Sequence, residues 1–181
     1  MGCFIRKSLH RCRISAGTKF SSIAHSHASR AWVGQMIEGV LLTPLKKIDV
    51  PKGDVYHGIK ASDPGYEGFG EAYFSTVRGG AVKAWKKHKR MTLNLVVPVG
   101  KIGFVIFDDR DASGTNGRFA QFALSLDNYN RLTIPPGLWL GFKGVGEDTN
   151  LLLNLANIEH ELEEGVKRSM NEIVFDWSTL E

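Results

Sequence analysis

LTIPPGLW, residues 132–139, is the stretch that decides the fold. Ile134 ends an apolar run, and the two prolines after it exclude a helix and remove two backbone donors. Gly137 can adopt a positive φ, and a second apolar run begins directly after it. A tight corner of this kind is typical of a small barrel in which the chain passes from one sheet to another.

The sequence on both sides of this corner also consists of short apolar runs separated by turns. Apolar runs of about four to eight residues are separated by turns rich in Gly, Pro and Asp, at intervals of about 8–12 residues. This pattern predicts an all-β sandwich or barrel. We expect strands over residues 39–45, 55–61, 70–77, 81–86, 91–97, 103–107, 119–126, 131–134, 138–142 and 150–156.

Two regions allow finer predictions. Residues 91–97 and 101–107 are apolar runs joined by a short link that ends in Gly100, so we expect them to form a hairpin, followed by a polar loop. Residues 158–166 contain four glutamates and could form either a short helix or an acidic loop.

The composition excludes several classes of protein. The chain has 181 residues, room for one domain, and no stretch approaches the 18 or so consecutive apolar residues of a membrane span. Residues 1–35 hold six Lys/Arg and no Asp/Glu, which leaves 17 Lys/Arg against 19 Asp/Glu in residues 36–181. The basic character therefore belongs to the first 35 residues and does not indicate a nucleic-acid partner. Both cysteines lie there too, so the rest of the chain has no Cys-ligated zinc site.

We expect residues 1–35 to be a disordered basic extension and residues 36–181 to be a single domain. Two interpretations of the extension stay open: an organelle-type transit peptide, or a start upstream of a natural first residue at Met36. Gly2 and Cys3 also loosely match a myristoylation and palmitoylation start, although Arg6 stands where Ser or Thr is expected.

The strongest chemical signal is the basic segment KAWKKHKR, residues 83–90. In a strand, Lys86, His88 and Arg90 project to one face and the residues between them to the other. Like-charge repulsion from the cations keeps such an imidazole neutral, which suits a general base near pH 7. The cations could also bind a diphosphate and stabilise an enolate oxygen. The structural alternative is a solvated edge strand whose lysines deter aggregation.

Weaker candidates are spread along the chain. Tyr73 is a possible proton donor, and His57 could line a binding site. Trp139 could stack on a nucleotide base, while Arg118 and Lys143 could hold phosphates. Each has a structural alternative in core packing, a turn or plain surface charge. Because the histidines and acids show no metal-ligand spacing, we expect no metal site.

Residues 97–109 and 132–142 together resemble the sugar-nucleotide cupins. This group includes dTDP-4-dehydrorhamnose 3,5-epimerase and the dTDP-4-keto-6-deoxyglucose 3,4-ketoisomerases. Its members carry an IPPGxxHGF corner, preceded by a strand that reads RGLHxQ or RGxHxH and that falls here on residues 83–89. The resemblance covers residues 37–157.

The resemblance implies a cupin-type double-stranded β-helix, or jelly roll, that forms a homodimer. It implies a cytoplasmic enzyme that binds a nucleotide sugar, uses no cofactor or metal, and binds neither nucleic acid nor a membrane. A base would remove the proton next to the C4 ketone, and a second group would return a proton to the opposite face or to another carbon. The product would be a deoxysugar for surface polysaccharide.

The sequence departs from the family pattern at the catalytic positions. Lys86 stands at the base His of the RGLH strand, and Lys83 replaces the Arg. Only the second His of RGxHxH is matched, by His88. Leu140 replaces the His of the corner, and no Tyr stands at 152–154, where the resemblance places the family's acid.

We therefore expect catalytic roles for His88, Lys86 and Tyr73. Six residues are expected to bind the substrate: Lys83, Arg90, Arg118, Trp139, Lys143 and His57. The alternative, favoured by the missing His and Tyr, is a non-catalytic subunit that binds a sugar nucleotide.

Overall fold

The structure is a computed structural model that describes residues 36–180, so the expected basic extension lies outside the described residues. The described part is almost entirely β, as predicted. Its elements are β1 (Leu41–Pro44), β2 (Lys47–Ile48), β3 (Val55–Tyr56), β4 (Glu71–Arg78), β5 (Val82–His88), β6 (Leu93–Val99), β7 (Lys101–Phe107), β8 (Phe119–Ser125), β9 (Asn130–Ile134), β10 (Trp139–Gly144), β11 (Thr149–Ala156), β12 (Gly165–Lys167) and the 3₁₀ turn η1 (Trp177–Thr179).

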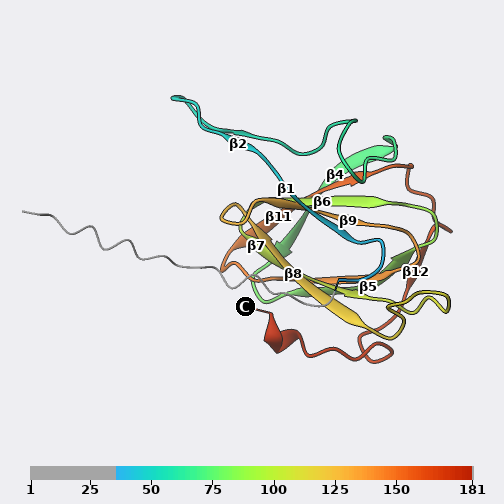
Figure 1. The fold of residues 1–181 in the computed structure, drawn as a ribbon. Coiled ribbons are helices and arrows are strands. Elements are labelled where there is room, and N and C mark those ends of the chain that lie inside the picture. Colours follow the sequence, from blue (N-terminus) through green and yellow to red (C-terminus); the bar gives the residue numbers. More distant parts are fainter. Residues whose placement is uncertain (1–35, 181) are drawn as a thin grey trace, which may run out of the picture. The chain divides into compact units, whose positions relative to one another are not determined.

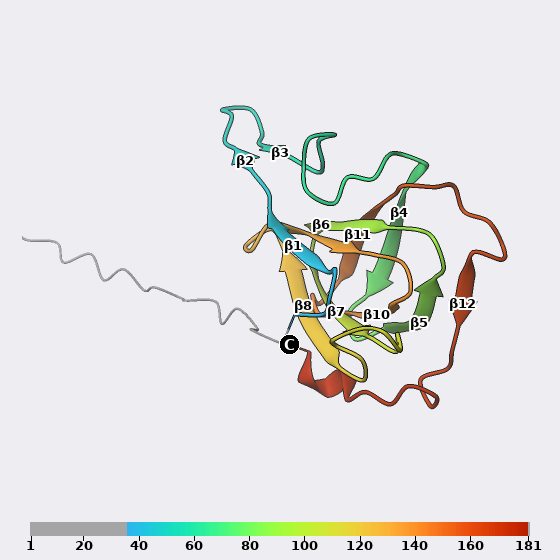
Figure 2. The same ribbon diagram turned by 45° about the vertical axis from the view of Figure 1, so that its right-hand side comes forward.

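Ten of these strands form two five-stranded sheets that face each other (Figures 1 and 2). The first sheet has the order β1-β9-β6-β11-β4, and the second has the order β12-β5-β10-β7-β8. Every neighbouring pair is antiparallel. Strands β2 and β3 form a small ribbon that projects from the sandwich (Figure 2).

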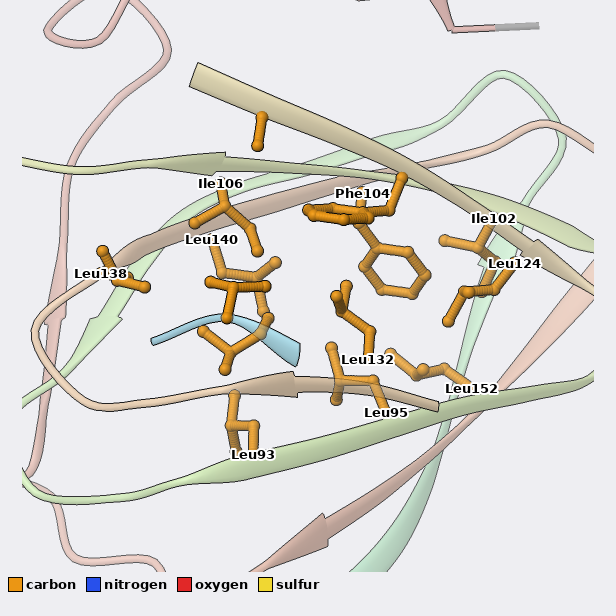
Figure 3. Close-up of a cluster of buried hydrophobic side chains, with 14 of the residues drawn as sticks. Leu93, Leu95, Ile102, Phe104, Ile106, Leu124, Leu132, Leu138, Leu140 and Leu152 are labelled. Carbon is orange, nitrogen blue, oxygen red and sulfur yellow. The ribbon is translucent and has the colours of Figure 1, made fainter. Parts of the chain in front are cut away.

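The main core fills the space between the two sheets (Figure 3). Alternate residues of each strand point inward, as the period of two requires. They include Leu93 and Leu95 from the first sheet and Phe104 and Ile106 from the second, each at most 3% exposed. Burial of these large side chains provides the main stabilisation of the sandwich.

The corner at residues 135–138 leads from β9 in the first sheet to β10 in the second, as the sequence predicts. The expected hairpin of residues 91–97 and 101–107 is wrong, because β6 and β7 lie in different sheets. Gly100 has φ +78°, and the side-chain oxygen of Asn150 accepts the backbone N–H of Lys101 at 2.7 Å. This bond from a distant strand holds the link as a corner between sheets.

Two irregular segments cover the outer faces. The C-terminal residues pack on the second sheet, where Ile173 and Leu180 join the buried Trp85 and Trp139. The segment before β4 packs on the first sheet, where the fully buried Arg131 donates to the carbonyl oxygens of Gly58 and Pro64. Between β11 and β12 the chain forms the acidic loop and not the helix. Within residues 36–180, no helix is both long and apolar enough to span a bilayer.

Candidate active site

A cavity of about 440 Å³ opens between the two sheets, a size suited to a small ligand. The first sheet contributes β4, β6 and β11, and the second contributes β5, β10 and β12. In both views the edge strands β4 and β12 lie at the same end of the sandwich, together with β5, the neighbour of β12 (Figures 1 and 2). The polar side chains that line the cavity are Tyr73, Ser75, Lys83, Lys86, His88, Asn154 and Lys167.

His88 lies at the end of β5, is only 6% exposed, and lines the cavity. Its Nδ1 is hydrogen-bonded to Oε2 of Glu164, whose side chain is fully buried. The other carboxylate oxygen, Oε1, accepts the backbone N–H groups of Arg90 and Met91, both at 2.9 Å. Glu164 is therefore fixed on both oxygens and in turn fixes the imidazole ring.

The protonation states of this pair follow from its surroundings. Burial alone would raise the pKa of Glu164, but the two backbone N–H groups and His88 lower the pKa to about 2. Burial lowers the pKa of His88, and the Lys86 charge lowers it further, against the opposing pull of Glu164. At neutral pH the carboxylate is charged and the imidazole is neutral. Its one proton must sit on Nδ1, facing the carboxylate, so Nε2 carries the lone pair.

Three lysines give the cavity a positive charge. Lys86 lies half-buried on the same strand face as His88, and burial lowers its pKa, although Glu164 opposes this. Lys83 donates to the carbonyl oxygen of Thr76 at 2.6 Å, and Lys167 enters from β12. Such a wall can bind an anion and stabilise negative charge that develops on a substrate oxygen.

The opposite wall carries a neutral polar pair. Tyr73 on β4 and Asn154 on β11 are direct partners across the two strands. The side-chain N–H of Asn154 donates to the hydroxyl oxygen of Tyr73 at 2.8 Å. Burial, with a smaller effect from Glu71, raises the pKa of Tyr73, so its phenol keeps its proton at neutral pH.

The structure brings together four of the residues expected in the site: His88, Lys86, Tyr73 and Lys83. The spacing from Lys83 to Lys86 is three residues, which would place them on opposite faces of a regular strand. Pairing with β10 shifts register between Leu140 and Phe142, and this irregularity puts both lysines in the cavity.

The other candidates lie away from the cavity. Arg90 lies beyond the end of β5 and pairs with an exposed glutamate, Glu161, at 2.6 Å. Trp139 is 1% exposed and packs on the outer face of the second sheet, where its indole N–H donates to Asp109.

Three further candidates also lie outside the residues that line the cavity. Lys143 donates to the carbonyl oxygens of Trp177 and Leu180 and so anchors the C-terminal segment. Arg118 is exposed beside the start of β8, and His57 follows β3 in the projecting ribbon.

The sequence analysis missed Ser75, Asn154 and Lys167, which line the cavity, and Glu164, which holds His88 from behind. Glu164 and Asn154 are separated from their partners by 76 and 81 residues. No local pattern distinguishes Glu164 from the other glutamates of the loop. A polar residue at an inward position of an apolar strand is the signal that could have identified Asn154. Within residues 36–180, no group of three or more potential metal ligands comes together.

Comparisons with known proteins agree with this architecture. The family model described as dTDP-4-dehydrorhamnose 3,5-epimerase matches residues 72–181. A probable low-salt glycan biosynthesis epimerase of Haloferax volcanii is 33% identical over 112 residues, which are 59% of this chain and 72% of the relative. A spore coat polysaccharide biosynthesis protein of Bacillus subtilis is 25% identical over 80% of this chain and 98% of its own length.

The crystal structure of a similar protein has the same fold. A dTDP sugar isomerase from Desulfovibrio desulfuricans superposes with a TM-score of 0.76 and 39% identity, over 80% of this chain and 94% of that one. The jelly-roll architecture expected from the corner motif is thereby confirmed.

Proposed function

The chain belongs to the dTDP-4-dehydrorhamnose 3,5-epimerase family, and from this premise we propose that it is an epimerase or isomerase of a nucleotide-linked 4-keto-6-deoxy sugar. The reaction starts with removal of the proton on a carbon next to the C4 ketone. The names of the relatives support a role in glycan biosynthesis.

The observation that carries this proposal is the buried pair of His88 and Glu164 in a cavity with lysines. Nε2 of His88 takes the proton from the carbon, and the electrons of the C–H bond move to the C4 oxygen to give an enolate. The ammonium group of Lys86 stabilises that oxygen. General base action of this kind contributes about 10²–10⁴-fold to a rate.

The position of the base differs from the family pattern that the sequence resembles. That pattern has its base His where this chain has Lys86. His88 lies two residues further along β5 on the same strand face, about 7 Å away. We assign the base role to His88 because its partner, Glu164, keeps a lone pair on Nε2.

The remaining roles follow the two walls of the cavity. Tyr73 returns a proton from the opposite wall, since its phenol stays protonated. The lysines Lys83 and Lys167 bind the diphosphate of the substrate. All steps use side chains, and none requires a metal or a cofactor.

We also propose a homodimer. Three exposed apolar side chains support an interface near the edge strand β4: Phe74 on β4, Val99 at the end of β6 and Phe69 just before β4 are 63%, 52% and 67% exposed. Light scattering should give twice the mass of the chain, and Phe74→Glu should give a monomer; a monomeric parent chain would contradict this. A cytoplasmic location is part of the same proposal, and cell fractionation tests it.

The test uses the purified protein in deuterated water with dTDP-4-keto-6-deoxyglucose. We expect deuterium at a carbon next to C4 and an epimer or keto isomer as product. The same assay with UDP, GDP and CDP 4-keto sugars identifies the nucleotide. Absence of exchange and of product with all four would reject the reaction class, and binding without exchange would identify a non-catalytic binding subunit.

A further inference from the structure

The inward face of β11 contains a residue that the packing of the sandwich does not explain. Leu152 and Ala156 point inward and are each 2% exposed, as expected for a core strand. Asn154 lies between them and is 7% exposed. A leucine at this position would continue the core without any polar group to satisfy.

The hydrogen bonding of Asn154 is one-sided. Its side-chain N–H donates to the hydroxyl oxygen of Tyr73, while its side-chain oxygen, also buried, has no partner within residues 36–180. An unsatisfied buried oxygen costs stability. Polar groups retained at such a cost concentrate at functional sites, and this one lines the cavity.

The direction of the bond determines what Tyr73 can do. Because the Tyr73 oxygen accepts from Asn154, the phenolic hydrogen is free to be donated to another group. Tyr73 is 37% exposed and lines the cavity, so a ligand there can receive this hydrogen.

The base and this phenol reach the cavity from opposite sides. Tyr73 belongs to β4 in the first sheet and His88 to β5 in the second, and both strands line the cavity. A sugar ring bound between the sheets therefore meets Nε2 on one face and the phenol on the other. This is the arrangement that inversion at a carbon requires.

We propose that Asn154 is a positioning residue that holds the phenol of Tyr73 as the proton donor opposite His88. This inference rests on the proposed function. In the family pattern that the sequence resembles, one tyrosine near residues 152–154 is the acid; here Tyr73 on β4 would donate the proton, and Asn154 on β11 would hold it in place. The O–H bond of Tyr73 breaks, its proton bonds to the enolate carbon, and the phenolate that remains accepts the N–H of Asn154. After product release, water returns a proton to the phenolate of Tyr73 and takes the substrate's proton from Nε2 of His88.

The test separates removal of the substrate proton from its return. In deuterated water, proton exchange at the substrate carbon reports His88, and net inversion reports Tyr73. For Asn154→Leu we expect exchange within about twofold of the parent protein and inversion reduced about 10²-fold. Tyr73→Phe should behave in the same way, and the double variant should be no slower than Tyr73→Phe alone.

Two controls exclude a general structural effect. Leu155→Ala changes the next residue of β11, outside the cavity lining, and should leave the ratio of inversion to exchange unchanged. Titration of the phenol by its absorbance, with Tyr73→Phe as the blank, should give a higher pKa in Asn154→Leu than in the parent. The reason is that the N–H that stabilises the phenolate has been removed.

Three outcomes would overturn the inference. Asn154→Leu could keep the parental inversion rate, it could lose exchange and inversion equally, or it could leave the Tyr73 titration unchanged. Each would leave the proposed function standing if the parent protein is active. A parent protein that neither exchanges nor isomerises any of the four substrates would reject the function and this inference together.

Discussion

The two sheets contribute reactive groups with opposite roles to the cavity: His88 of the second sheet accepts a proton, and Tyr73 of the first sheet donates one. On the second sheet, Nε2 of His88 must be free of a proton, and the ring is buried beside a lysine and held at Nδ1 by a charged carboxylate. On the first sheet, Tyr73 must keep its proton, and its partner is a neutral amide. Burial therefore favours the neutral form of both groups, since it lowers the pKa of His88 and raises the pKa of Tyr73, while the partner behind each group fixes which atom faces the cavity.

The largest expected effect is the loss of proton exchange when His88 is replaced. In His88→Asn the side-chain amide can still donate to Glu164, but no titrating nitrogen faces the cavity. We expect proton exchange to fall about 10³-fold, because the base is gone. Lys89→Ala, which changes the exposed neighbour, should keep parental exchange. If His88→Asn exchanged protons at the parental rate, another group would be the base.

The next largest effect comes from Glu164→Gln, which keeps the shape of the side chain. Its oxygen can still accept the two backbone N–H groups, but its amide nitrogen now donates to Nδ1 of His88. The imidazole proton must then move to Nε2, and the base is lost although the ring stays in place. We expect kcat to fall about 10²-fold while Tm changes little. A variant with full kcat would show that the carboxylate does not set the tautomer.

A smaller effect is expected for Lys86→Met. The Lys86 charge lowers the pKa of His88, so its removal raises that pKa. The acid limb of kcat/KM, where His88 becomes protonated, should therefore move to higher pH. At alkaline pH the rate should fall about tenfold, since the enolate loses one of its cations. An acid limb that stays in place or moves to lower pH would contradict this electrostatic coupling.

Much of the fold could be predicted because its signals are local. Alternation and turn residues marked ten of the twelve strands, and the prolines at 135–136 marked the passage between sheets. The link at Gly100 was misread because a glycine turn suits both a hairpin and a corner between sheets. The choice depends on Asn150, 49 residues away from its partner Lys101.

Only the part of the site that lies within a single strand could be predicted in detail. The face of β5 that carries Lys86 and His88 follows from a period of two. The partners of the two reactive side chains come from distant parts of the sequence. Pairing of β12 with β5 brings Glu164 to His88, and pairing of β11 with β4 brings Asn154 to Tyr73. A single strand gives no indication of which carboxylate or amide will stand behind its reactive group.

The proposed reaction depends on the protonation of His88 at neutral pH. Nitrogen NMR of the histidine-labelled protein, with His88→Asn to assign the signal, measures it directly. We expect a neutral ring at pH 7 with the proton on Nδ1 and a bare Nε2. A charged ring, or a neutral ring with the proton on Nε2, would contradict it.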